Sequence, residues 1–397
     1  MAAQFEAINQ PARAVGPARS GAAATLTARH VQSRALARSL QSRALARSLE
    51  VPLFGGNRID VRTQAREARA LVCETVARAT DHVNLQGIAW LVEPHGEPLV
   101  QRLLARRRDG VRVNLMLDEA SIGAAALPAL RALRSAGVRI GALGPRAAWR
   151  ALLEAREPAR ALIVVDGRIA LTGGVAGDDG ACLVCVEGPA VAELQWLFVD
   201  RWRRRVPAPL PNGHYFPALS WVGSQRIGLA TADSDCGRAA HERTLVAAVD
   251  AARDRVLLVG AGGLPNKTLR LALAAACVRG VDVHLLLSEG KRASARSSCM
   301  PWLRAGVHVH LLRSAPGAAA SVVDGVWSTL EAPGDARAVH AAERDHVIVL
   351  DADFGAQAES AFWRDVARSN EVTHPTGQPH ALRRLNLRLA RYLEVSP

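Results

Sequence analysis

The stretch LIVVDGRIALTGG, Leu162 to Gly174, decides how this chain folds. Two short β-branched runs, 163–165 and 169–171, flank the pair Asp166-Gly167. Apolar runs separated by Asp-Gly are typical of a tight β-hairpin, because these two residues tolerate the left-handed backbone that the turn requires. An echo, SVVDGVWST, spans Ser321 to Thr329 and repeats the Val-Val-Asp-Gly core. One hairpin occurring twice predicts a duplicated domain.

Three further segments recur in the same order in the two halves of the chain. They are ATDHVNL (79–85) and ARDRVLL (252–258), GVRVNLML (110–117) and GVDVHLLL (280–287), and LRSAGVR (133–139) and LRAGVHV (303–309). Four matches in one order are not expected by chance. Because helix-like and strand-like segments alternate, we predict an α/β fold of two α/β lobes related by a pseudo-twofold axis.

The pattern divides the chain into five parts. Residues 1–50 form a low-complexity basic arm with the nonapeptide QSRALARSL twice in tandem. The nine-residue shift leaves the copies half a helical turn out of phase, so the arm has no continuous apolar stripe. We expect a first lobe at 51–206, a stiff proline-rich linker at 207–220, a second lobe at 221–372 and a basic amphipathic tail at 373–397.

Within the first lobe, hydrophobic periodicity predicts helices and strands in alternation. The predicted helices span 63–79, 97–109, 127–136 and 189–205, and the predicted strands, besides the hairpin, span 82–87, 111–117, 138–143 and 182–187.

The charge of the chain is +13, and every basic residue except Lys267 and Lys291 is an arginine. Arginine pairs bidentately with phosphate, so an anionic lipid or a nucleic acid fits as a partner, and an ordinary solvated basic surface is an equal alternative. Only 4% of the residues are aromatic, which argues against a platform for single-stranded nucleic acid. No run approaches the roughly 18 apolar residues that span a bilayer.

Six scattered cysteines point to a reducing compartment. Cys182 and Cys185 have the spacing of a zinc or redox pair, but a second pair that would complete a tetrahedral site is missing from the sequence. We interpret them as buried strand residues and expect neither a metal nor a cofactor.

In its repeated hairpin and in several longer segments, the chain resembles the phospholipase D superfamily and, within it, the bacterial cardiolipin synthases. The resemblance begins near Gly55 and runs to the C-terminus. The segments that carry it are LIVVDGRIALTGG, VEGPAVAELQWLFVDRWRR (186–204), VRGVDVHLLL (278–287), VVDGVWST (322–329) and VLDADFGAQAESAFWRD (349–365).

The resemblance implies a catalytic motif of His-x-Lys, followed by Asp five residues after the Lys, once in each half. In that family one histidine attacks the phosphodiester, the other protonates the leaving alkoxide, and the lysines hold the phosphate oxygens. The corresponding positions here are Ala159, Ala161 and Asp166 in the first half and Gly317, Ala319 and Asp324 in the second. Both halves have therefore lost the histidine and the lysine.

The two retained aspartates each precede glycine in a turn. Aspartate is favoured there for its local hydrogen bonding, so folding alone explains why Asp166 and Asp324 persist. Other family features differ as well, since Ala176 replaces a motif asparagine and Gln86 matches a glutamate of the first strand. Losses that fall on the chemistry while the scaffold is kept are typical of a pseudoenzyme.

Several residues are candidate replacements for the missing histidines and lysines. Arg160 lies between the two alanines and is a candidate phosphate ligand, although strand alternation would direct it away from them. His308 and His310 alternate on a predicted strand and should share a face. His346 follows the second hairpin, but without a symmetry mate it cannot rebuild a two-histidine site.

The C-terminal stretch LRRLNLRLARYL (382–393) has a helical pattern with leucines on one face and arginines opposite. Such a helix can lie on an anionic membrane, in which case Arg384, Arg388, Leu389 and Arg391 are its binding residues. The alternative is that the leucines dock on the protein body.

Three functions stay open at this point. The first is a catalytically inactive relative of cardiolipin synthase that binds anionic phospholipid at a membrane surface or an active paralogue. The second is an active phosphatidyltransferase with a rebuilt site. The third is a nucleic-acid-binding phospholipase D-like protein. For the first we expect a bacterial, cytoplasmic protein, peripheral on the inner face of the cytoplasmic membrane.

Overall fold

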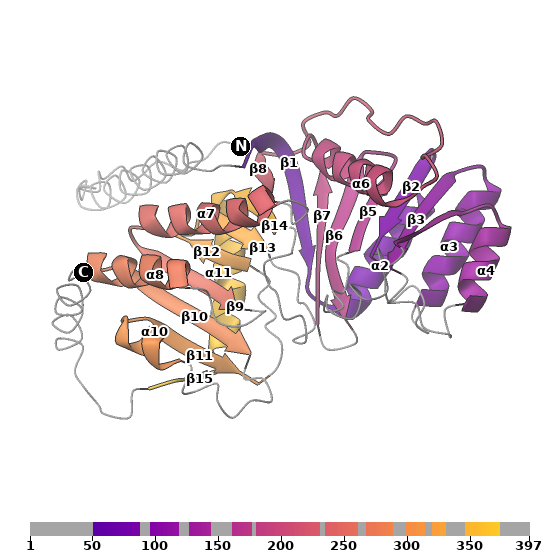
Figure 1. Cartoon of the computed structure of the whole chain (residues 1–397). Coiled ribbons are helices and arrows are strands. Elements are labelled where there is room, and N and C mark those ends of the chain that lie inside the picture. The colour runs from indigo at the N-terminus through magenta and orange to yellow at the C-terminus, as the bar shows by residue number, and fades with distance from the viewer. Residues whose placement is uncertain are drawn as a thin grey trace, which may run out of the picture. The chain divides into compact units, whose positions relative to one another are not determined.

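The computed structural model describes residues 51–87, 96–118, 127–143, 161–176, 180–230, 235–260, 267–288, 299–313, 320–330 and 346–373. All of them belong to one compact unit that begins at residue 45. The fold is mixed α/β and is built on one sheet of 15 strands with helices packed against it (Figure 1).

The elements of the first half of the chain run up to residue 205. Its strands are β1 (Leu53–Arg62), β2 (His82–Gln86), β3 (Arg112–Asp118), β4 (Arg139–Leu143), β5 (Ala161–Val165), β6 (Ile169–Ala176) and β7 (Gly180–Glu187). Its helices are α2 (Ala65–Ala77), α3 (Glu97–Arg108), α4 (Leu127–Ser135) and α6 (Val191–Arg205).

The elements of the second half follow from residue 225. Its strands are β8 (Gln225–Ala230), β9 (Arg255–Gly260), β10 (Asp282–Ser288), β11 (His308–Leu312), β12 (Ala320–Val323), β13 (Trp327–Leu330), β14 (His346–Leu350) and β15 (Asn370–Glu371). Its helices are α7 (Asp235–Ala251), α8 (Lys267–Arg279), α10 (Met300–Arg304) and α11 (Ala352–Val366).

The strand order reads the same way outward from the antiparallel pair β1 and β8. On the side of β1 come β7, β6, β5, β2, β3 and β4, and on the side of β8 come β14, β13, β12, β9, β10 and β11. Strands β2, β3 and β4 are parallel to one another, as are β9, β10 and β11. The short strand β15 adds antiparallel to β11.

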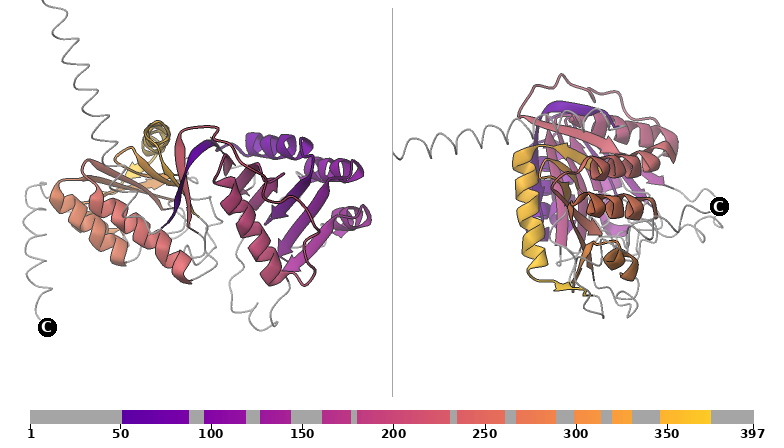
Figure 2. Two further views of the ribbon diagram at one scale, coloured as in Figure 1. Left: turned by 90° about the horizontal axis from the view of Figure 1, so that it is seen from above. Right: turned by 90° about the vertical axis from the view of Figure 1, so that its left-hand side faces the viewer.

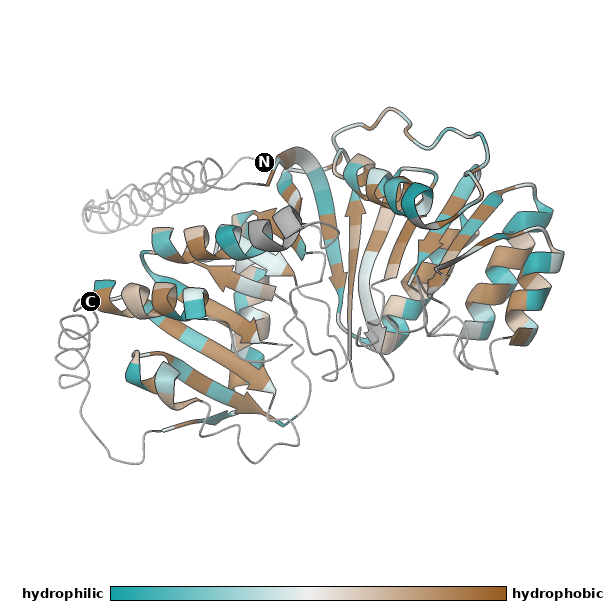
Figure 3. Cartoon of the chain, viewed as in Figure 1, coloured by the Kyte–Doolittle hydropathy of each residue, from teal (hydrophilic) through white to brown (hydrophobic). Residues whose placement is uncertain are grey.

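Helices cover both faces of the sheet (Figure 2). In the first half, α2, α3 and α4 pack on one face through an aliphatic core that includes Leu103 and Leu115, while α6 packs through Phe198 and Trp202. In the second half, α7, α8 and α10 lie on one face and α11 on the other. The strands are accordingly apolar along most of their length, and the helices carry polar residues outward (Figure 3). Burial on both faces explains these near-continuous apolar runs.

The predicted first-half helices and strands are confirmed to within two residues at each end. The predicted hairpins are confirmed too, since β5 pairs with β6 and β12 pairs with β13. Strands β1 and β8 and helix α7 were not predicted. In β1 the pair Gly55-Gly56 interrupts the strand pattern, and the register with β8 shifts between Phe54 and Asn57. The described helices are each too short or too polar to cross a membrane.

Residues 207–224, here called the strap, connect α6 to β8 and lie against the first half. Trp202 Nε1 donates to the Ala208 carbonyl at 2.8 Å, and Arg139 Nη1 donates to the Pro209 carbonyl at 2.8 Å. Farther along, the Val222 N–H donates to the Gly56 carbonyl at 2.9 Å. The proline-rich segment is therefore bound along its length to the elements that precede it. The domain boundaries expected from the sequence stay predictions.

Candidate active site

The degenerate motif positions fall partly inside the described residues. Ala161 is the first residue of β5 and is buried, 5% exposed, in the core under α2 and α3. Asp166 and Asp324 lie in the two hairpin turns. Ala159, Arg160, Gly317 and Ala319 are outside the described residues, as are the tail residues Arg384, Arg388, Leu389 and Arg391. Where Ala161 stands, only a methyl group is available, so this position has no cation to offer a phosphate.

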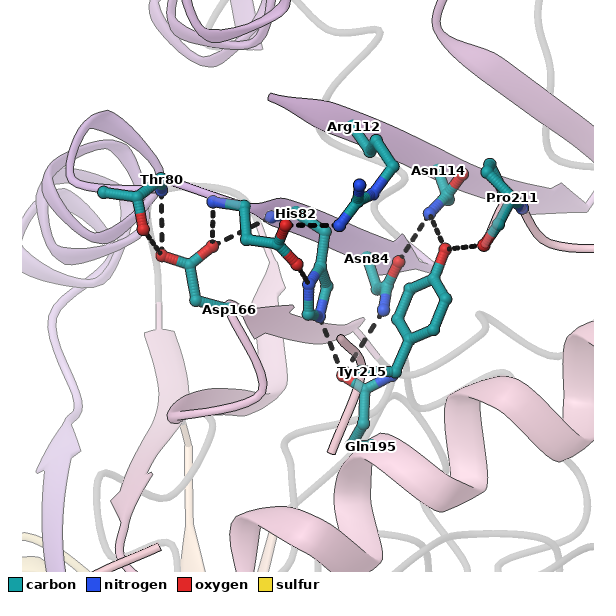
Figure 4. Close-up of polar contacts among 10 residues, drawn as sticks. Thr80, His82, Asn84, Arg112, Asn114, Asp166, Gln195, Pro211 and Tyr215 are labelled. Atoms are coloured by element: carbon teal, nitrogen blue, oxygen red, sulfur yellow. Dashed lines mark hydrogen bonds and ion pairs between the residues drawn. The ribbon is translucent and has the colours of Figure 1, made fainter. Parts of the chain in front are cut away.

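Asp166 ties the first hairpin to the loop before β2. Its φ is 53°, in the left-handed region, and Gly167 follows at 64°, as a type I′ turn requires. One carboxylate oxygen accepts the Thr80 N–H at 2.8 Å and the Thr80 hydroxyl at 2.9 Å. The other accepts the N–H groups of Asp81 and His82 at 2.8 and 2.9 Å (Figure 4). The carboxylate thus holds the entry of β2 in place.

Asp324 does the same in the second half. Its φ is 51°, and its carboxylate accepts the backbone N–H groups of Arg253, Asp254 and Arg255 at 2.8 to 2.9 Å. These partners lie 69 to 86 residues away in the chain, so the carboxylates also make long-range hydrogen bonds that the local turn pattern did not predict. Each carboxylate satisfies backbone donors at the start of a parallel strand, which explains its retention through folding.

A chain of buried polar side chains links β2, β3 and α6 in the first half (Figure 4). Asn114 Nδ2 donates to Asn84 Oδ1 at 2.8 Å, and Asn84 Nδ2 donates to Gln195 Oε1 at 3.3 Å. His82 Nε2 lies 3.4 Å from the same oxygen of Gln195. Tyr215 of the strap packs edge-on against the His82 ring with centroids 4.7 Å apart. This network fixes α6 and the strap to the sheet.

The outer end of that network is charged. Asp81 receives hydrogen bonds from His82 Nδ1, at 2.8 Å, and from Arg112. Partial burial disfavours the Asp81 carboxylate, but the hydrogen bonds from His82 and Arg112 outweigh it and hold its pKa below the ordinary value. Burial raises the pKa of Tyr215, whose hydroxyl donates to the Pro211 carbonyl at 2.9 Å. These groups stabilise one another and leave the strap firmly attached.

A second group of titratable side chains lies on β10 and β11. His308 and His310 share a face, as predicted, and both stack on His284. His284 bridges the Asp282 carboxylate, 2.9 Å from its Nε2, and His310 Nε2, 3.0 Å from its Nδ1. Burial lowers the pKa of His310 to about 4 and also lowers the pKa of His284. His310 is therefore neutral near pH 7.

Strand β15 attaches to this histidine group through one carboxylate. His308 Nδ1 lies 3.0 Å from Glu371 Oε1, and that hydrogen bond lowers the pKa of Glu371. Among the described residues, no set of three or more His, Cys, Asp or Glu side chains is arranged to hold a metal ion. The histidine group links β10, β11 and β15 through ring stacking and hydrogen bonds.

Two other histidines meet between helix α7 and strand β14. His241 of α7 stacks on His346 of β14, with ring centroids 3.3 Å apart and planes at 9°. His346 is adjacent to Val347, whose row across the sheet passes through Leu330 to Ala320. His241 comes from the same half of the chain as His346, so it is not the symmetry mate that a two-histidine site of this family would need. Its contact with His346 was not predicted, because helix α7 was not predicted.

Cys182 and Cys185 both lie in β7, as interpreted from the sequence. They belong to different cores on opposite faces of the sheet, so they cannot ligate one metal together. Burial raises the pKa of Cys185 to about 12. Its thiol is thus an inert part of the core.

Comparisons with known proteins agree with this architecture. No protein-family model matches the chain. It is 26% identical over 371 residues to a cardiolipin synthase A of Pseudomonas putida, covering 86% of this chain and 76% of the relative. It is 28% identical over 375 residues to a cardiolipin synthase A of Pseudomonas fluorescens, with the same coverage. Among solved structures, the phosphatidylserine synthase of Haemophilus influenzae superposes with a TM-score of 0.56 at 11% identity, covering 89% of this chain and 98% of that one.

The superposition shows that the chain shares its fold with the phosphatidylserine synthase. The sequence similarities support a phospholipase D-like protein, and within that class one that is similar to the cardiolipin synthases.

Proposed function

We propose that this chain is a catalytically inactive cardiolipin synthase-like protein that binds anionic phospholipid, or an active paralogue, at the inner face of the cytoplasmic membrane. The observation that carries the proposal is the replacement of the motif residues by Ala159, Ala161, Gly317 and Ala319 in a chain that keeps the fold. Relatives named as cardiolipin synthase and phosphatidylserine synthase support a phospholipid ligand.

The chemistry supports inactivity. Phosphodiester transfer through a phosphohistidine needs an imidazole as nucleophile, a second to protonate the leaving alkoxide, and fixed cations for the developing charge. Methyl groups and hydrogen atoms at the four positions supply none of these. The aspartates that remain are occupied by backbone N–H groups, so their presence has a structural cause that does not depend on activity.

We also propose that the two halves arose by duplication and are related by a pseudo-twofold axis. The identical strand order outward from β1 and β8 supports this, as do the matching roles of Asp166 and Asp324. On this proposal the four degenerate positions line one shared cleft. Arg160, between Ala159 and Ala161, is the proposed phosphate contact of that cleft. The proposed membrane-binding residues are Arg384, Arg388, Leu389 and Arg391 of the tail.

The deciding experiment supplies purified protein with phosphatidylglycerol vesicles and measures cardiolipin and released glycerol. We expect neither above a no-protein control, while the protein sediments with the vesicles. A fourfold variant, Ala159→His, Ala161→Lys, Gly317→His and Ala319→Lys, should gain a trace of activity. The matched control carries Gln in place of the two new histidines and should stay inactive. Turnover by the unmodified chain would overturn the proposal, and preference for duplex DNA over vesicles would favour a nucleic-acid-binding role.

A second candidate is an active phosphatidyltransferase with a rebuilt site. The pair of His241 and His346 favours it, because an imidazole serves as nucleophile or proton carrier near neutral pH and these two lie side by side, although both come from the second half. If the unmodified chain turns over phosphatidylglycerol, His346→Gln should abolish that activity. His214→Gln, at an exposed position of the strap, is the matched control and should keep it.

A further inference from the structure

The end of the strap and the first residue of β8 form an uncharged segment that is rich in large apolar residues. Residues 215–225, YFPALSWVGSQ, hold no charged side chain, although 22% of the chain is charged. Tyr215, Pro217 and Leu219 turn toward the protein, and Leu219 packs on the core shared by α6 and β14. Phe216 and Trp221 point the other way and are 54% and 80% exposed.

Trp221 is held in this exposed position by the backbone beneath it. A Cβ atom on Gly56 would lie 2.5 Å from the indole ring, so the ring rests directly on the Gly56 backbone. The φ of Gly56 is 81°, a conformation that glycine adopts without strain. The N–H of Val222, itself 42% exposed, is bonded to the Gly56 carbonyl. The indole therefore covers one small patch of β1 and presents its other face outward.

Positive charge surrounds this segment. Arg168 reaches the strap, with Nη1 3.4 Å from the Ala218 carbonyl, and Arg226 is exposed just past its end. Arg58, beside Gly56 in β1, is also exposed, and it neutralises the nearby Glu187 through a 2.6 Å ion pair. Arg58 and Glu187 thus cancel, and Arg168 and Arg226 leave the rim of the segment with a positive charge.

We propose that Phe216, Trp221 and Val222 form an anchor that inserts into the headgroup region of an anionic lipid bilayer, and this rests on the phospholipid binding proposed above. Tryptophan favours the boundary between water and hydrocarbon, because its large apolar ring carries one polar N–H. The basic rim adds attraction to anionic headgroups. A stable protein interface buries about 800 Å² on each partner, more than three side chains on one extended segment provide. A bilayer needs no such matching surface.

The test measures sedimentation with sucrose-loaded vesicles of phosphatidylcholine containing phosphatidylglycerol, with pure phosphatidylcholine for comparison. The anchor variant is Phe216→Ser with Trp221→Ser. The matched control is Leu271→Ser with Val278→Ser, two residues of α8 that are 51% and 49% exposed. We expect the anchor variant to bind anionic vesicles at least about tenfold more weakly and the control to bind as the unmodified chain does. Circular dichroism and melting temperature establish that both variants fold.

Fluorescence reports on Trp221 itself. Anionic vesicles should shift the tryptophan emission of the unmodified chain to shorter wavelength, and Trp221→Phe should remove that shift. Failure of the unmodified chain to bind any vesicle would overturn the phospholipid proposal together with the anchor. Equal binding by the anchor variant and the control would overturn the anchor alone. If sedimentation velocity shows that the unmodified chain self-associates and the anchor variant does not, while both bind vesicles equally, the segment forms a contact between two copies. That result would also overturn the anchor proposal.

Discussion

Replacing Asp166 with asparagine tests whether this motif residue is kept for folding. The two oxygens of the carboxylate accept four hydrogen bonds, two each, from Thr80, Asp81 and His82. An amide can serve one pair of donors, while its NH₂ group faces the other pair. Asparagine tolerates the left-handed backbone at φ 53°, so the turn itself is not strained.

The expected loss in the free energy of unfolding follows from those four hydrogen bonds. A hydrogen bond to a charged group contributes about 1.5–3 kcal/mol, so losing two would cost roughly 3–6 kcal/mol if water could not replace the carboxylate. Thr80 is exposed, and water can serve its donors. We therefore expect Asp166→Asn to lower the free energy of unfolding by about 2–3 kcal/mol. Asp166→Ala should cost about 1 kcal/mol more, because alanine in the left-handed region is strained.

Urea denaturation followed by circular dichroism measures these changes. Asp109→Asn is the matched control, since Asp109 pairs with Arg106 at the surface and should matter by less than about 0.5 kcal/mol. Amide exchange should also accelerate at Thr80, Asp81 and His82. An Asp166→Asn protein as stable as the control, with those amides still protected, would refute the folding explanation for the retained aspartate.

Four other outcomes are expected. The pKa of His310 is lowered to about 4 in the folded state, so below pH 6.5 the unfolded chain binds a proton that the folded chain does not. The free energy of unfolding should therefore fall by about 2–3 kcal/mol as the pH drops from 6.5 to 4. Urea denaturation at a series of pH values measures this fall, and His310→Gln should make the free energy of unfolding less dependent on pH in that range. Cys185, with a pKa of about 12, should resist iodoacetamide at pH 8 in the native protein and react in urea, as peptide mass spectrometry would show. Gly167→Ala places a Cβ 2.5 Å from the Tyr215 carbonyl at a φ of 64° and should expose the strap to limited proteolysis, whereas Gly110→Ala, with open space around it, should not. If the tail binds membranes, replacing Arg384, Arg388 and Arg391 with Gln should weaken binding to anionic vesicles by roughly two orders of magnitude, at about 1 kcal/mol per arginine, and a chain ending at Thr376 should bind as weakly.

The sequence predicted the elements that carry their own periodicity. The Val-Val-Asp-Gly hairpins, the parallel strands and α6 are each specified by residues within one segment, so pattern alone located them. Strand β1 was missed because Gly55-Gly56 breaks its alternation, and its pairing is specified by β7 and β8.

In the candidate site, too, residue identities could be predicted from the sequence and long-range contacts could not. The proposed loss of the histidines and lysines rests on residue identity alone, because the motif spacing is counted from Asp166 and Asp324. The partners of those aspartates could not be predicted, since they lie in loops far away in the chain. The contact between His241 and His346 likewise depends on how α7 packs over β14. Long-range packing decides these contacts, and a single sequence does not encode it in any local pattern.

Strand β1 has a consequence for the synthesis of the chain on the ribosome. It is made first, yet Glu187 in β7, the partner of its Arg58, lies 129 residues later, and Gln225 in β8, the partner of its Asn57, lies 168 residues later. At about 5–20 residues per second, β1 waits roughly 6 to 26 seconds for its first neighbour. During that interval a strand with both edges unpaired is available to pair with other chains. The nascent protein should therefore depend most on chaperones while its first 190 or so residues are being made.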